Sequence, residues 1–134
     1  MSNNESIKYF DLHTTGIGYL NRVREVTPEE GTPFLSVTIA ALRGIVDNVQ
    51  YTHFECPVSG KKAQAIVRRL KPAVEGKLKV LIGFTLSDLY AESFTYKNGD
   101  KAGETGVSLK ARLLSVSWAK VDCQPFVTEQ EIAA

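Results

Sequence analysis

The segment KKAQAIVRRL, residues 61–70, has the clearest helical pattern in the chain. Its apolar residues recur at spacings of three and four, which places them on one buried face of a helix: Ala63, Ile66, Val67 and Leu70. Ser59 is the expected N-cap, and Pro72 and Gly76 are expected to end the helix. The segments on either side of this single helix therefore decide the fold.

The flanking segments alternate between apolar and polar side chains, as half-buried β-strands do. Three strands are expected before the helix and two after it, at residues 16–26, 34–42, 49–56, 78–86 and 107–121. Turn residues fill 27–33, and a glycine-rich loop containing Asn98-Gly99 follows an aromatic segment at 90–96. In the last strand the alternation shifts at Leu113–Leu114, which predicts a β-bulge.

The order of three strands, one helix and two strands is that of a five-stranded oligonucleotide-binding (OB) barrel. We therefore predict a mostly β fold with the helix between strands three and four and a long hairpin arm between strands four and five. A chain of 134 residues has room for one such domain. The expected division is an N-terminal extension at 1–15, the OB domain at 16–121 and a short acidic C-terminal tail at 122–134.

Composition and charge restrict the class of protein. The net charge is only +1, yet residues 61–79 contain seven basic side chains and one acidic side chain. The start of the chain lacks the apolar core of a signal peptide, and no apolar run approaches the roughly 20 residues that span a bilayer. These features predict a cytoplasmic protein without membrane contact. Cys56 and Cys123 lie far apart in sequence and are expected to be free thiols.

The sequence lacks the common catalytic motifs. There is no Walker loop, no Gly-x-Ser-x-Gly elbow and no His-Glu-x-x-His motif. Glu29 and Glu30 are adjacent in a turn, where a solvated loop is the expected role. His13 and His53 have no nearby set of metal ligands. We therefore expect a protein that is not an enzyme, with no cofactor, no metal and no catalytic residue.

Several segments resemble those of bacterial single-stranded DNA-binding proteins over about residues 16–121. They are Gly18-Tyr-Leu-Asn-Arg22, the β-rich Phe34 to Ala41, Tyr51 and His53 ahead of Gly60-Lys-Lys-Ala63, Glu75-Gly-Lys-Leu-Lys-Val-Leu-Ile-Gly83, and Phe94 to Gly99. The resemblance implies non-catalytic binding of single-stranded DNA. The linker and terminal acidic tip of that family are missing, because eight residues follow Pro125-Phe126.

Over its whole length the chain more closely resembles small replication-associated proteins of integrative conjugative elements. The similar segments are Asp11-Leu-His-Thr-Thr-Gly-Ile-Gly-Tyr19 and Gly103-Glu-Thr-Gly-Val-Ser-Leu-Lys-Ala111. This resemblance implies a role in the replication or transfer of mobile DNA.

Binding a single strand without reading its sequence requires aromatic faces for the bases and cations along the phosphates. The candidate stacking residues are Tyr51, His53, Phe94 and Tyr96. The candidate phosphate contacts are Arg22, Arg24, Arg43, Lys97, Lys101, Lys110 and Arg112. Four other aromatic residues are expected to pack in the core or at its rim instead: Phe34, Phe54, Phe84 and Trp118.

Two questions remain open at this stage. The first is whether the helix cations contribute to binding or only keep an exposed helix face soluble, and the second role is expected for Lys61, Lys62, Arg68 and Arg69. The second functional hypothesis is a protein–protein adaptor in a replication or conjugation complex, because the net charge is near zero and the tail is acidic. Under either hypothesis, exposed edge strands favour a homo-oligomer, a dimer or a tetramer.

Overall fold

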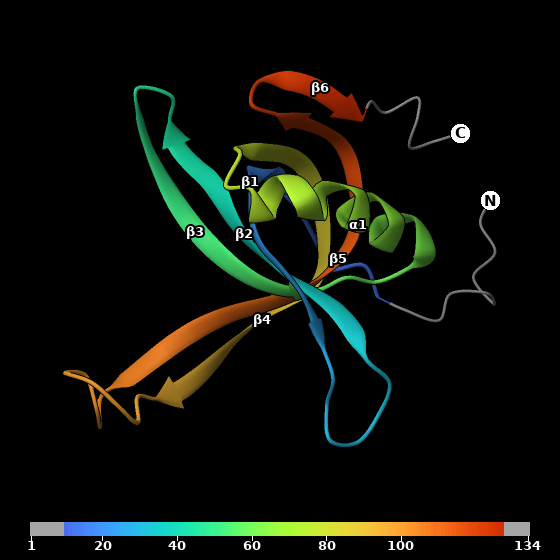
Figure 1. Cartoon of the computed structure of the whole chain (residues 1–134). Coiled ribbons are helices and arrows are strands. Elements are labelled where there is room, and N and C mark those ends of the chain that lie inside the picture. Colours follow the sequence, from blue (N-terminus) through green and yellow to red (C-terminus); the bar gives the residue numbers. More distant parts are fainter. Residues whose placement is uncertain (1–9, 128–134) are drawn as a thin grey trace.

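Six strands and one helix form the fold in the computed structural model, which describes residues 10–127 (Figure 1). The elements are β1 (His13–Val26), β2 (Phe34–Ile45), β3 (Asn48–Pro57), α1 (Lys61–Glu75), β4 (Val80–Thr95), β5 (Thr105–Val121) and β6 (Gln124–Val127). The sheet order is β3-β2-β1-β4-β5-β6, and parallel pairing of β3 with β5 closes the first five strands into a barrel. The predicted OB barrel, the position of its helix and the long β4–β5 arm are confirmed.

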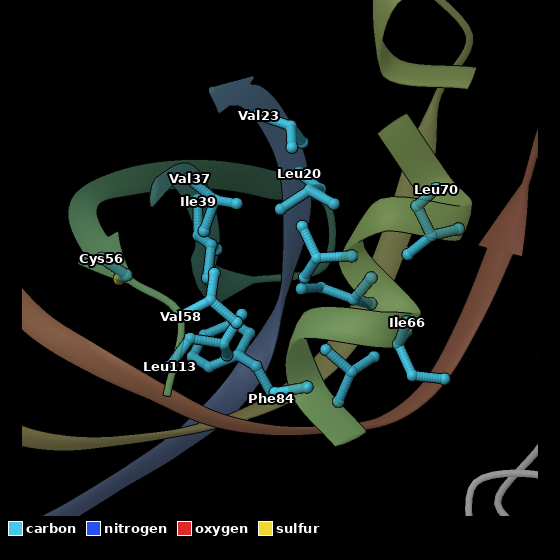
Figure 2. Packing of buried hydrophobic residues seen from close by; sticks show 14 of the residues in the cluster. Leu20, Val23, Val37, Ile39, Cys56, Val58, Ile66, Leu70, Phe84 and Leu113 are labelled. Atoms are coloured by element: carbon cyan, nitrogen blue, oxygen red, sulfur yellow. The ribbon is translucent and has the colours of Figure 1, made fainter. Parts of the chain in front are cut away.

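Alternation along the strands sorts side chains between the barrel core and its outer surface. On β2, Leu35, Val37 and Ile39 are fully buried, and on β3, Phe54 and Cys56 are buried, whereas Tyr51 and His53 are exposed. Figure 2 shows the α1 side chains Ile66 and Leu70 in one cluster with residues of the strands. Each large apolar side chain buried in this way stabilises the fold by about 1.5–3 kcal/mol. Phe54 and Phe84 pack in this core as expected.

The helix differs from its prediction at both ends. Gly60, with a φ of 91°, is the N-cap residue and no side chain caps the helix, so the prediction of Ser59 was wrong. Pro72 does not end the helix, which continues to Glu75. The missing N–H of Pro72 removes one helical hydrogen bond, but the last turn is held because Ala73 and Val74 pack against the core. Gly76 is the C-cap residue that ends the helix, as predicted. Its N–H donates a hydrogen bond to the Pro72 carbonyl at 2.9 Å.

Strand β5 contains the predicted bulge and a second one. The register skips Leu114, which confirms the shift expected there, and it skips again at Ser117. The second bulge turns Ala119 into the core and places Trp118 on the outer face opposite Gly83. A Cβ at Gly83 would overlap the indole of Trp118, so this position requires glycine for close approach.

The six-stranded sheet extends past the boundaries expected for the domain. β1 begins at His13, within the predicted N-terminal extension, and β6 pairs with β5 within the predicted acidic tail. The remaining parts of both predicted segments, residues 1–9 and 128–134, lie outside the described residues. Within residues 10–127, the helical structure is too short and too polar to cross a lipid bilayer.

Candidate nucleic-acid interface

The outer face of β2 has a floor of small side chains. Ser36, Thr38 and Ala40 alternate with the core residues of β2 and point away from the core, yet they are only 5%, 8% and 6% exposed. They are covered because longer side chains flank them on the neighbouring strands. In register, Arg24 and Pro57 flank Ser36, Arg22 and Glu55 flank Thr38, and Tyr19 and His53 flank Ala40. We call this floor and its six flanking residues the β2 groove.

A bulge in β1 aligns the groove wall. The register with β2 shifts between Leu20 and Arg22, so Asn21 is the extra residue. Leu20 and Val23 can therefore both face the core, and both are buried. Without the bulge, a slip of one residue would turn the side chains beyond it to the opposite face. The bulge thus keeps Tyr19 and Arg22 on the same side of the sheet.

A hollow of about 560 Å³ lies at the Ala40 end of the groove, and we call it the tyrosine hollow. Its lining includes Tyr19, Asn21, Tyr51, His53, Lys77, Leu78 and Lys79. The rings of Tyr19 and Tyr51 have centroids 6.5 Å apart and are tilted by 47°, and Tyr51 is 47% exposed. Among residues 10–127, no carboxylate lines this hollow. Its lysines therefore supply positive charge beside ring faces open to solvent.

The connection between α1 and β4 is what brings the two lysines to the tyrosine hollow. Lys77 has a left-handed φ of 63°, and the next N–H, that of Leu78, bonds to the Ala73 carbonyl at 3.0 Å. The Lys79 N–H bonds to the Asp122 carboxylate at 3.0 Å, and the Asp122 N–H bonds to the Lys79 carbonyl at 2.8 Å. The backbone is thus held at both ends of the connection, while both lysine side chains are exposed.

A second hollow, of about 520 Å³, lies at the Ser36 end of the groove, and we call it the arm-base hollow. Its lining includes Arg24, Phe34, Glu55, Asp88, Tyr90, Lys110 and Arg112. Phe34, which was expected to pack in the core or at its rim, is 40% exposed here. It is the first residue of β2, beyond the end of the core.

The predicted cations of the arm-base hollow are paired with carboxylates. The pairs are Arg24–Glu55 at 3.6 Å, Arg112–Asp88 at 3.3 Å and Lys110–Glu92 at 3.0 Å. The hydrogen bond to Glu92 raises the pKa of Lys110 above its usual value. A phosphate entering this hollow would have to compete with these carboxylates, whereas the lining of the tyrosine hollow contains no such competitor.

The predicted aromatic residues of the arm form a separate cluster. Phe94 pairs with Gly106, four residues beyond the Tyr90–Lys110 pair at the arm base, a separation of about 13 Å along the strand. The rings of Phe94 and Tyr96 meet edge to face at 4.9 Å, and the Lys101 ammonium lies 5.5 Å from the Tyr96 ring centre. Figure 1 shows the arm and the β2–β3 hairpin extending from the barrel in different directions. These residues, with Lys97 in the adjoining loop, are thus not brought together with Tyr51 and His53.

The other predicted cations divide between the two faces of the sheet. Arg22 lies in the β2 groove beside Thr38. Arg43 does not, because it shares the core-facing side of β2 with Ala41, beyond the end of the core, and its Nε donates to the Thr52 hydroxyl at 2.9 Å. The structure adds residues that sequence reasoning had not selected: Tyr19, Tyr90, Lys77 and Lys79. The two lysines belong to the basic segment at 61–79, and the charge of that segment is the sequence feature that could have pointed to them.

Comparison with known proteins gives a family and one similar structure. No curated protein matches the sequence. The crystal structure of Rim1, a mitochondrial single-stranded DNA-binding protein of S. cerevisiae, is 10% identical, with a TM-score of 0.41 over 84% of this chain and 96% of Rim1. The sequence matches a family described as "Protein of unknown function (DUF3577)" over residues 3–134. The chain therefore belongs to the DUF3577 family.

Proposed function

We propose that this protein binds single-stranded DNA in the β2 groove and does not act on it chemically. The supporting observation is the tyrosine hollow, which is lined by Tyr19, Tyr51 and His53, by Ala40 of the floor and by Lys77 and Lys79. Stacking of one base on an aromatic side chain contributes about 1–3 kcal/mol. Lysines beside the rings are placed to neutralise the phosphates that accompany stacked bases.

The arm-base hollow continues the same path. From Ala40 to Ser36 the floor runs four residues along β2, about 13 Å, and both hollows open onto it. Tyr90 and Phe34 offer further ring surface at this end. The arm cluster of Phe94, Tyr96, Lys97 and Lys101 is a second proposed contact, available to strands that are long enough to reach it.

Fluorescence anisotropy with a labelled oligo-dT tests this proposal. Y51A is expected to lower the affinity by about 5- to 150-fold, the equivalent of 1–3 kcal/mol, at unchanged salt dependence. Y96A serves as the matched control, because it removes the same side chain from the arm cluster. It is expected to weaken binding of long oligonucleotides only. Wild-type protein that fails to bind at tens of micromolar, or full affinity in Y51A with a native circular dichroism spectrum, would contradict the proposal.

A second proposal is a protein–protein adaptor in a replication or conjugation complex. It is favoured by the carboxylates that neutralise the arm-base cations, and by Ile45 and Val46, which are exposed at the tip of the β2–β3 hairpin. A pull-down with and without nuclease separates the two proposals. A partner that remains after nuclease treatment, combined with no binding of oligonucleotides, would favour the adaptor.

The biological setting is also proposed. The resemblance to proteins of integrative conjugative elements supports a role in replication or transfer of mobile DNA in the cytoplasm. We further propose a homo-oligomer, a dimer or a tetramer, in which edge strands pair between copies. Light scattering coupled to size-exclusion chromatography measures the mass in solution. A monomeric mass at all concentrations would rule out the oligomer.

A further inference from the structure

Glu55 lies on β3 between the tyrosine hollow and the rest of the arm-base hollow. It lines the arm-base hollow, and His53, two residues earlier on the same face of β3, lines the tyrosine hollow. Glu55 lies directly opposite Thr38 in the middle of the groove floor. It is also the single acidic residue among the six that flank the floor. A strand that passes from one hollow to the other must therefore cross this carboxylate.

The Glu55 carboxylate is fixed by its neighbours. The Thr38 hydroxyl donates a hydrogen bond to Oε2 at 3.0 Å. The Arg24 guanidinium lies 3.6 Å from Oε1, which is an ion pair but longer than a direct hydrogen bond. The side chain remains 32% exposed. Oε1 can therefore still accept a hydrogen bond from a ligand in the groove, in an orientation that Thr38 and Arg24 hold.

The chemistry of a fixed carboxylate distinguishes the bases. It can only accept hydrogen bonds, and the N4 amino group of cytosine donates one, a pairing that proteins use for cytosine. Thymine presents the O4 acceptor at the same position, which the carboxylate repels, and its one donor on this edge, N3–H, lies between two carbonyl oxygens that the carboxylate also repels. We propose that Glu55 makes the groove prefer cytosine over thymine. This inference rests on the proposed binding of single-stranded DNA.

The test compares oligo-dC and oligo-dT of equal length at the same ionic strength and mildly alkaline pH. Wild-type protein is expected to bind oligo-dC at least about fivefold more tightly, the lower end of the discrimination given by one good contact to a base. In E55Q the affinity ratio is expected to fall to about one, because the glutamine amide can also donate to thymine O4. The affinity for both oligonucleotides is expected to rise, since one negative charge is removed.

Two further variants separate base selection from charge. E92Q removes a carboxylate that pairs with Lys110 outside the groove walls. It is expected to raise the affinities for oligo-dC and oligo-dT alike and to leave the ratio of the two affinities unchanged. T38V keeps the charge of Glu55 but removes the hydrogen bond to Oε2, so it is expected to reduce the ratio. T38V also keeps the test decisive if E55Q does not fold.

The possible outcomes point to different conclusions. Equal binding of the two oligonucleotides by the wild type would overturn the inference while leaving the proposed function intact. A preference for oligo-dC that persists in both E55Q and T38V would also overturn it. If neither oligonucleotide binds, the proposed function itself fails.

Discussion

Neutralising Lys77 and Lys79 is expected to weaken binding of single-stranded DNA by an amount that depends on salt. Both side chains line the tyrosine hollow, and none of the described residues that line it carries a carboxylate. Each phosphate contact on a single strand contributes about 0.7 to the slope of log affinity against log salt. The double variant K77Q/K79Q should therefore have a slope shallower by about 1.4.

That change in slope fixes the expected loss of affinity. If wild-type and variant affinities converge near 1 M salt, the variant binds about 25-fold more weakly at 0.1 M and about tenfold more weakly at 0.2 M. Anisotropy titrations of labelled oligo-dT at four or so salt concentrations measure both the slope and the loss. The measurement separates phosphate contacts from base stacking, because stacking is expected to leave the slope unchanged.

The matched control is K61Q/K62Q. It removes the same charge from the first turn of α1, where both lysines are exposed and neither lines a hollow. Its affinity is expected to change by less than about twofold, since neither lysine lines one of the two hollows and salt screens exposed charges that do not contact the strand. An equal loss in both double variants would refute the reasoning, because total charge rather than the hollow would then govern binding. An unchanged salt slope in K77Q/K79Q would refute it too.

Two further predictions concern stability and thiol chemistry. G83A is expected to lower the free energy of unfolding by about 1–3 kcal/mol, because the new Cβ overlaps the indole of Trp118. Urea denaturation followed by tryptophan fluorescence measures this, and a change within about 0.5 kcal/mol would show that the strand adapts without strain. Burial raises the pKa of the Cys56 thiol to about 12, whereas Cys123 is an exposed free thiol. Ellman's reagent should therefore modify one thiol quickly in the native protein and the second only after unfolding, and rapid modification of both would contradict the buried position of Cys56.

The fold could be predicted because burial of one face of a strand appears in the sequence as alternating apolar and polar residues. The alternation of β2 and β3 placed the core side chains correctly, and the shift at Leu113–Leu114 correctly marked a bulge. The extension of α1 past Pro72 could not be read from local propensity, because packing of the last turn against the core holds it. Propensity describes a segment alone, whereas this turn is stabilised by residues distant in sequence.

The candidate site was predictable only in part, because it depends on which side chains share a face. Tyr51 and His53 were correctly placed outward by parity along β3. The same parity, applied to β2, would have placed Arg43 on the core-facing side, so that signal was present and unused. Tyr19 gave no such signal. Its alignment with Arg22 requires the bulge at Asn21, which appears only in the register between strands.

The cations of the arm-base hollow are paired with carboxylates, whereas the described lining of the tyrosine hollow contains no carboxylate, and this difference affects how a strand would bind. In the tyrosine hollow, a DNA strand bound as proposed would displace water and counterions, whose release is favourable. In the arm-base hollow it must also replace the carboxylates paired with Lys110 and Arg112. Those ion pairs are partly exposed and each contributes only about 0–1 kcal/mol, so phosphates can replace them at little loss. The proposed path therefore begins at Tyr19 and Tyr51, and each nucleotide added toward Tyr90 should increase the affinity by less than those bound first.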